Sequence, residues 1–170
     1  GSKPQPRNLR FLEAPSADYY AMKRHGMMHA RSDLIAFVDS DCIYPRDYVP
    51  RLLEAFDDPE VQIVAARVRY PPTSARLKAG SVRDWGHLPD QGTTLCHFAG
   101  SAFAARRQIL ERHDFGLGFQ RVGAELVLCI LARMEGAGIR YLPDLTIFHE
   151  NYYRTFRTVR AWMFRRLAMT

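Results

Sequence analysis

The chain has 170 residues, of which 47% are hydrophobic and 25% are charged, a composition typical of one soluble globular domain with a substantial core. No run of about 18 apolar residues is present, which excludes a membrane-spanning helix at the level of sequence. The formal net charge of +6 suits an anionic partner, such as nucleic acid, anionic lipid or a phosphorylated substrate, and equally a solvated basic surface.

The predicted elements alternate between strands and helices, which indicates an α/β domain. In chain order they are a strand at 9–12, a helix at 18–30, a strand at 34–38, a helix at 45–56, a strand at 61–66, a strand at 95–104, a helix at 106–112, a helix at 125–136, strands at 139–142 and 145–148, and a helix at 155–170. Residues 1–8 are polar and rich in proline, and we expect a flexible lead-in there.

The most informative motif is the buried strand predicted at 34–38, which ends in Asp39-Ser40-Asp41. Ligands of open α/β sheets gather at the carboxyl ends of strands. Side chains at i and i+2 of a strand share a face, so both carboxylates can point into one cleft. Two acids there can hold Mg²⁺ or Mn²⁺, which in turn binds a diphosphate. The alternative is a pair of solvated loop acids, one of which caps the next helix.

Two more residues have both a chemical and a structural interpretation. His149 ends an apolar strand and is either a further metal or phosphate ligand or a structural histidine. Glu125 begins a helix and is either a general base or an acid favoured by the helix dipole.

The long segment 71–94 is rich in proline and glycine and shows little periodicity, so it is either functional or disordered. Trp85 within it either stacks on a sugar ring as a loop closes or anchors that loop. Arg106 and Arg107 are either phosphate contacts or surface charge. Three widely spaced cysteines, Cys42, Cys96 and Cys129, form no zinc pattern, and reduced thiols favour a cytoplasmic location.

Taken together, the segments resemble the inverting family-2 glycosyltransferases of GT-A fold. The resemblance covers roughly residues 9–153 and rests on the order of the motifs. Residues 19–26 and 30–33 resemble the family's helix before its acidic strand, and Phe37 to Asp41 matches its DxD element. Residues 98–107 resemble the segment that lines the acceptor and donor-sugar side. Residues 115–125, with Leu128, Arg133 and Gly138, resemble the stretch that carries the base, and 143–144 with 148–150 match the closing strand.

The resemblance implies a mixed sheet flanked by helices and a metal-dependent transfer from a nucleotide-sugar, most simply a UDP-sugar, to a carbohydrate or lipid-linked hydroxyl. Asp39 and Asp41 would hold the donor and the metal, and His149 would complete the metal site, with Mg²⁺ or Mn²⁺ as the ion. Glu125 would be the base, and Trp85, Gly100 and Ser101 would line the sugar side.

Two departures from the family pattern leave an alternative open, namely an inactive GT-A-like binding or assembly domain. Ala124-Glu125 stands where the family has Glu-Asp, and the strand-helix-strand that normally precedes the motifs is expected to be absent before Leu9. The expected division is a lead-in at 1–8, a partial GT-A-like domain at 9–153 and a basic amphipathic helix at 154–170.

That helix either packs on the domain or lies on a membrane surface, which would make a cytoplasmic protein membrane-associated. A nucleic-acid-binding module is disfavoured because aromatic and basic residues are not interleaved in a recognisable motif.

Overall fold

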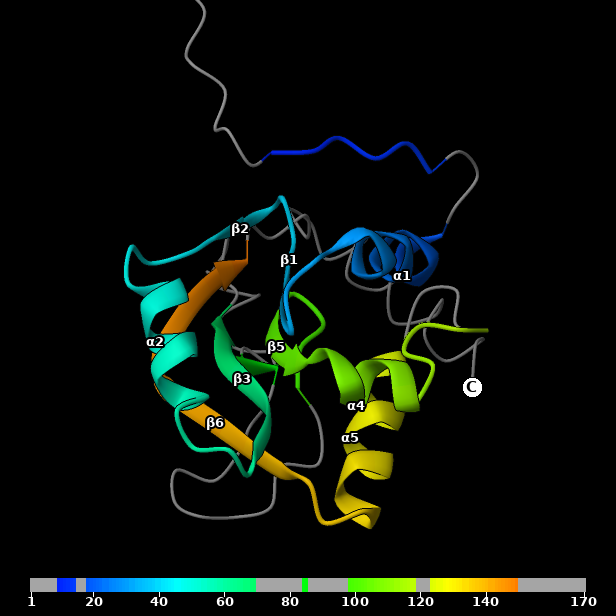
Figure 1. Cartoon of the computed structure of the whole chain (residues 1–170). Helices are drawn as coiled ribbons and strands as arrows, with labels where there is room; N and C mark the ends of the chain where they lie inside the picture. Colours follow the sequence, from blue (N-terminus) through cyan, green and yellow to red (C-terminus); the bar gives the residue numbers. More distant parts are fainter. Residues whose placement is uncertain (1–8, 15–17, 70–83, 86–97, 119–122, 150–170) are drawn as a thin grey trace, which may run out of the picture.

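The computed structural model describes residues 9–14, 18–69, 84–85, 98–118 and 123–149 (Figure 1). The predictions for the lead-in at 1–8, for the helix at 154–170 and for most of the segment 71–94 lie outside these residues. No helix in the described part is long and apolar enough to cross a membrane.

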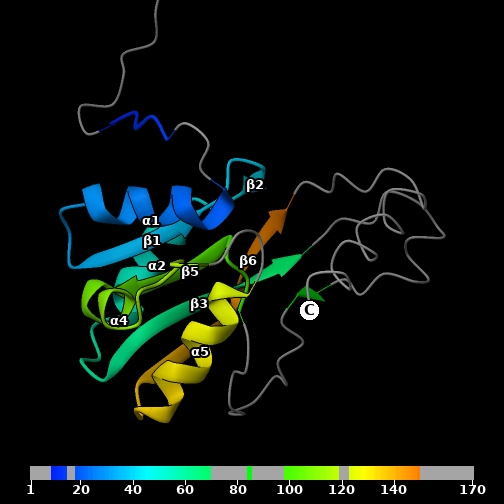
Figure 2. The same cartoon turned by 90° about the vertical axis from the view of Figure 1, so that its right-hand side faces the viewer.

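A mixed sheet of six strands forms the centre of the described structure. Its strands are β1 (Leu34–Val38), β2 (Cys42–Ile43), β3 (Val61–Arg69), β4 (Asp84–Trp85), β5 (Ala102–Arg106) and β6 (Gly138–His149). The order across the sheet is β1-β5-β3-β6-β2, and β4 pairs with the end of β3. Figure 2 shows β1, β5 and β3 following one another across the sheet. Only β3 and β6 pair in parallel, and the other pairs are antiparallel.

Helices cover both faces of the sheet. They are α1 (Tyr19–His29), α2 (Tyr48–Ala55), α4 (Arg107–Arg112) and α5 (Ala124–Met134). α2 packs on one face, where Leu52 and Val64 belong to one hydrophobic cluster. Figure 1 shows α1, α4 and α5 on the other face. On that face Phe103 is completely buried among aromatic rings. This arrangement confirms the predicted α/β class and the sheet flanked by helices.

Polar side chains fix the two ends of α1. The Asp18 carboxylate accepts a hydrogen bond of 3.0 Å from the backbone N–H of Ala21, the geometry of an N-cap, so Asp18 caps this helix. At the other end, the Arg107 guanidinium donates to the carbonyls of Met27, Ala30 and Ser32. These carbonyls lie at the C-terminus of α1 and in the turn that follows it, where a helix leaves acceptors without a full set of intrahelical partners.

Arg106 has an equally structural role, because it donates to the carbonyls of Val61 and Phe56 and thereby ties β5 to the turn before β3. Both arginines are therefore engaged by backbone oxygens, and neither faces the site described below. The sequence left phosphate contact and surface charge open for these two arginines, and the structure shows both of them bonded to backbone carbonyls.

Several strand predictions need correction. Residues 9–12 form no strand, and Phe11 is 79% exposed, because this segment finds no sheet partner in the described structure. The strand at 34–38 has the predicted bounds but lies at the sheet edge, so only Ile35 and Phe37 are buried. The two strands expected at 139–142 and 145–148 are one strand, β6. Its pairing with β3 shifts register at Pro143, where a proline without an N–H is tolerated in a bulge.

Candidate active site at the carboxyl end of the sheet

The candidate site lies where three parallel strand ends and the start of β5 meet. β1, β3 and β6 run in the same direction, and β6 ends at His149. Val38 pairs with Ala102, so continuing the register past this pair brings Asp39 opposite Ser101 and next to Gly100. The topology thus gathers the acidic motif, the Gly100-Ser101 turn and His149 at one edge of the sheet, as the strand directions require.

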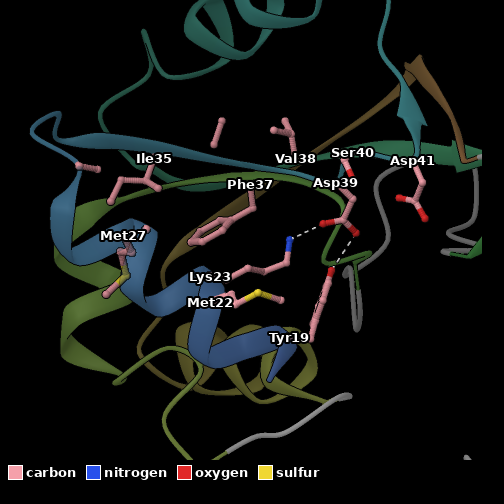
Figure 3. Close-up of a pocket in the computed structure, with 13 residues that line it drawn as sticks. Tyr19, Met22, Lys23, Met27, Ile35, Phe37, Val38, Asp39, Ser40 and Asp41 are labelled. Carbon is pink, nitrogen blue, oxygen red and sulfur yellow. Dashed lines mark hydrogen bonds and ion pairs between the residues drawn. The ribbon is translucent and has the colours of Figure 1, made fainter. Parts of the chain in front are cut away.

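The Asp39 carboxylate is held by two side chains of α1 (Figure 3). Lys23 Nζ lies 2.7 Å from Oδ1, and the Tyr19 hydroxyl donates to Oδ2 at 2.9 Å. Lys23 also donates to the carbonyl of Gly100 at 2.9 Å. Burial, and then the charge of Asp39, raises the pKa of Tyr19, so its hydroxyl stays a donor at neutral pH. Tyr19 and Lys23 are four residues apart and therefore share one face of α1.

Tyr44 fixes the backbone around the acidic motif. Its hydroxyl accepts from the backbone N–H of Asp39 at 2.8 Å and donates to the carbonyl of Ser101, also at 2.8 Å. The end of β1 and the turn before β5 are therefore joined by one side chain. Ser101 is only 4% exposed, and its carbonyl is the group that the Tyr44 hydroxyl contacts.

Asp41 belongs to a second cluster, with Cys42 and His149. Asp41 Oδ1 lies 3.7 Å from His149 Nε2 and 4.0 Å from Cys42 Sγ. One ligand atom from each of the three residues lies within 4.8 Å of the other two. Antiparallel pairing of Cys42 in β2 with His149 in β6 creates this proximity. Burial, reinforced by the charge of Asp41, raises the pKa of the Cys42 thiol to about 11.

Glu125 lies in the first turn of α5, next to Gly100. The Tyr20 hydroxyl donates to Glu125 Oε2, and burial raises the pKa of that hydroxyl. A Cβ atom at Gly100 would lie 3.1 Å from Glu125 Oε1 and 3.3 Å from the Tyr19 hydroxyl, so a glycine here keeps the space between the two groups open. Gly123, the N-cap of α5, has a φ of 102°, which favours glycine and lets the chain turn directly into the helix.

A cleft of about 640 Å³ runs between α1 and β1 and ends at the acidic motif (Figure 3). Met27 and Ile35 line its apolar part, and Lys23, Asp39 and Asp41 line its polar end. A cleft that is apolar along its length and charged at one end suits a ligand that has an apolar body and a polar or charged end.

The structure thus brings Asp39, Asp41, Gly100, Ser101, Glu125 and His149 to one end of the sheet. The backbone of Trp85 is at the same end, because it pairs with Val68, which also pairs with Ile147 of β6.

Sequence reasoning missed four participants: Tyr19, Lys23, Tyr44 and Cys42. The signal that could have revealed the first two is their spacing of four residues on a helix just before the acidic strand.

Comparison with known proteins identifies the family. The family model described as "Glycosyl transferase family 2" matches residues 3–114. A pre-mycofactocin glycosyltransferase of Mycobacterium tuberculosis is 29% identical over 160 residues, which are 86% of this chain and 32% of that protein. The chain therefore spans about a third of the length of this curated relative.

Solved structures resemble the chain in fold. A mannosyltransferase from Pyrobaculum calidifontis in complex with GDP-Man and Mn²⁺ superimposes with a TM-score of 0.55 at 20% identity, over 85% of this chain and 39% of that one. Glucosyl-3-phosphoglycerate synthase from Mycobacterium tuberculosis, in complex with Mn²⁺, UDP-Glc and phosphoglyceric acid, gives a TM-score of 0.54 at 20% identity, over 85% of this chain and 50% of that one. These structures confirm the GT-A fold expected from the sequence.

Proposed function

Because the chain belongs to glycosyltransferase family 2, we propose that it carries the catalytic centre of an enzyme that moves a sugar from a nucleoside-diphosphate donor to an acceptor hydroxyl. The observation that carries the proposal is the convergence of Asp39, Asp41, His149 and Glu125 at one end of the sheet. We further propose that the reaction depends on a divalent cation and inverts the anomeric carbon.

The Asp41 and His149 side chains suit a divalent cation. A carboxylate oxygen and an imidazole nitrogen 3.7 Å apart are donors that Mn²⁺ accepts, and both side chains are partly exposed, at 20% and 17%. Mg²⁺, which prefers oxygen and keeps several waters, is the other candidate. When bound, the cation would neutralise charge on the departing diphosphate. The structural relatives that hold Mn²⁺ with GDP-Man or UDP-Glc support a nucleotide-sugar donor, and a UDP-sugar is the donor we propose.

Asp39 is proposed to position the nucleoside. Each oxygen of its carboxylate already accepts one hydrogen bond, from Lys23 or from Tyr19, but a carboxylate offers about four acceptor positions. Asp39 lines the cleft, so its remaining positions suit the hydroxyl groups of a ribose bound there. Because Lys23 and Tyr19 fix the orientation of this carboxylate before the donor binds, little ordering is needed on binding.

Glu125 is proposed as the general base. Tyr20 occupies Oε2, which leaves Oε1, beside Gly100, to accept the proton of an attacking hydroxyl. The hydroxyl would attack the anomeric carbon from the face opposite the diphosphate, which gives inversion. Gly100 and Ser101 are proposed to border the sugar, and Trp85 to stack on it. The acceptor is proposed to be a carbohydrate or a lipid-linked molecule.

We also propose that the chain consists of a lead-in at 1–8, a GT-A-like domain at 9–153 and a helix at 154–170. The helix proposed at 154–170, which lies outside the described residues, is proposed to contact a membrane surface.

The test is Glu125→Gln in the protein that contains this chain, assayed with Mn²⁺ and a set of nucleotide-sugars. We expect kcat to fall about 10²- to 10⁴-fold, the usual loss for a general base, while donor affinity stays unchanged. Glu135→Gln is the matched control, because Glu135 lies just past the other end of α5 and pairs with Arg112.

Full activity of Glu125→Gln would remove the general-base role. Donor binding without transfer in the unmodified protein and in both variants would instead favour the alternative, a GT-A-like binding or assembly domain. The specific observation behind that alternative is Ala124, which stands where the family has an acid.

A further inference from the structure

We propose that the Cys42 thiol is a third protein ligand of the Asp41–His149 cation site, and that the site therefore binds Zn²⁺ and Co²⁺ more tightly than Mg²⁺. The inference rests on the cation site of the proposed function and adds a ligand to it. It concerns a residue that neither the sequence motifs nor the proposed reaction uses.

The geometry brings the thiol to the other two ligands. Cys42 and His149 are directly opposite in an antiparallel pair, where side chains extend to the same face of the sheet. Asp41 precedes Cys42, and its Oδ1 lies 4.0 Å from Sγ and 3.7 Å from His149 Nε2. In a tetrahedral site with bonds of about 2.0–2.3 Å, ligand atoms are about 3.3–3.8 Å apart. The cluster, all within 4.8 Å, reaches that spacing by small side-chain rotations.

The donor set determines which ions the site prefers. A carboxylate and an imidazole accept Mn²⁺ readily, whereas a thiolate is a soft ligand that favours Zn²⁺ and Co²⁺ over Mg²⁺. On binding, the Cys42 thiol releases its proton to solvent, and the thiolate and the Asp41 carboxylate together balance the charge of the dication. The fourth position stays available to water or to an oxygen of a diphosphate. Zn²⁺ should therefore compete with Mn²⁺ for this site.

The experiment is optical titration of the reduced 170-residue chain with Co²⁺, which reports its ligands without any enzymatic assay. We expect d–d bands of a low-symmetry site together with a near-ultraviolet thiolate-to-cobalt charge-transfer band. Cys42→Ser should abolish the charge-transfer band and weaken Zn²⁺ and Co²⁺ binding about tenfold or more, while Mn²⁺ affinity changes less than about threefold. Cys129→Ala is the matched control, because Cys129 is a buried core residue of α5, and this variant should keep the band.

Two outcomes overturn the inference and separate it from the proposed function. Co²⁺ binding that requires Asp41 and His149 but shows no thiolate band, or a band that persists in Cys42→Ser, removes Cys42 from the site and leaves the cation site intact. If neither Co²⁺ nor Mn²⁺ binds, both the Cys42 ligand and the cation site of the proposed function are removed.

If Cys42→Ser fails to fold, alkylation of the unmodified chain tests the proposal instead. Zn²⁺ should slow alkylation of Cys42 at least tenfold more than equimolar Mg²⁺ does, and equal rates with the two ions would contradict the proposal.

Discussion

Asp39 and Asp41 are separated by a single residue, yet their carboxylates lie in opposite kinds of surroundings. Both oxygens of Asp39 are held by α1, at 2.7 Å from Lys23 and 2.9 Å from Tyr19. Asp41 has His149 at 3.7 Å and Cys42 at 4.0 Å, distances that leave its carboxylate without a strong partner in its cluster. The Asp39 carboxylate is therefore oriented by the fold before any ligand binds, whereas the Asp41 carboxylate has no contact shorter than 3.7 Å within its cluster.

The largest expected effect is on stability, at Asp39. Asp39→Ala removes the carboxylate from Lys23, whose side chain is only 10% exposed, and leaves an unpaired ammonium in a poorly solvated position. We expect the free energy of unfolding to fall by about 3 kcal/mol, as for other ion pairs broken on one side. Urea denaturation followed by circular dichroism measures this loss.

A double-mutant cycle distinguishes the lost ion pair from simple loss of packing. In Asp39→Ala combined with Lys23→Met, no buried charge remains, so the double variant should be more stable than the sum of the two single losses predicts. Additive losses would show that Lys23 and Asp39 act independently, and the contrast between the two aspartates would then lose its basis.

The second expected effect is on metal binding, at Asp41. Asp41→Asn should weaken Mn²⁺ binding about 100-fold, because a charged ligand is lost, and should change the free energy of unfolding by less than about 1 kcal/mol. Calorimetric titration with Mn²⁺ and urea denaturation measure the two quantities on the same sample. Asp57→Asn, at an exposed position after α2, is the matched control and should leave Mn²⁺ affinity unchanged. A stability loss at Asp41 as large as that at Asp39 would contradict the comparison.

Local patterns were enough to predict the class of fold and most of its elements. The apolar run at 34–38 and the helical spacing in α2 and α5 agree with the structure to within a few residues. What local patterns missed is pairing between distant segments. β2 has only two residues and exists because Cys42 meets His149, more than 100 positions later in the chain. Leu9 to Leu12 has the composition of a strand but lies exposed and pairs with no strand among the described residues.

The same limit applies to the site. The order of Asp39, Asp41, Glu125 and His149 could be predicted because each follows or begins a recognisable element. The partners of these residues could not, since Lys23 reaches Asp39 only after α1 has packed on β1, and Tyr44 reaches Ser101 only after β5 has paired with β1. Arg107 is a further example, because its charge left phosphate contact and surface charge open, whereas its bond to the Ala30 carbonyl at the end of α1 depends on the packing of α4 beside α1.

A smaller loss of stability is expected at Tyr44, whose hydroxyl accepts a hydrogen bond from the backbone N–H of Asp39. Tyr44→Phe removes the hydroxyl that joins the N–H of Asp39 to the carbonyl of Ser101, and both backbone groups lose a partner. We expect a loss of about 1–2 kcal/mol in the free energy of unfolding, measured by urea denaturation at pH 8. Faster hydrogen exchange of the Asp39 amide in the variant would show that the loss is local, and unchanged exchange would refute the bridging role.

The smallest expected effect has the opposite sign and occurs at Tyr48, whose ring lies 4.9 Å from that of Tyr44. Its hydroxyl is buried and has no hydrogen-bond partner among the described residues. Tyr48→Phe removes an unsatisfied polar group and should raise the free energy of unfolding by about 1 kcal/mol at pH 8. Tyr44→Phe, which deletes the same atom from a bonded position, is the matched control.

The pH dependence tests the cause of this gain. Burial raises the pKa of Tyr48 above its ordinary value of 10.0, so the folded state holds the hydroxyl proton more tightly than the unfolded state does. The stability that this contributes is complete below pH 10 and is lost as pH rises beyond it, at up to about 1.4 kcal/mol per pH unit. Tyr48→Phe has no such proton, so its advantage over the unmodified chain should widen between pH 10 and pH 11. A constant difference across that range would mean that the hydroxyl is solvated and that the gain at pH 8 has another origin.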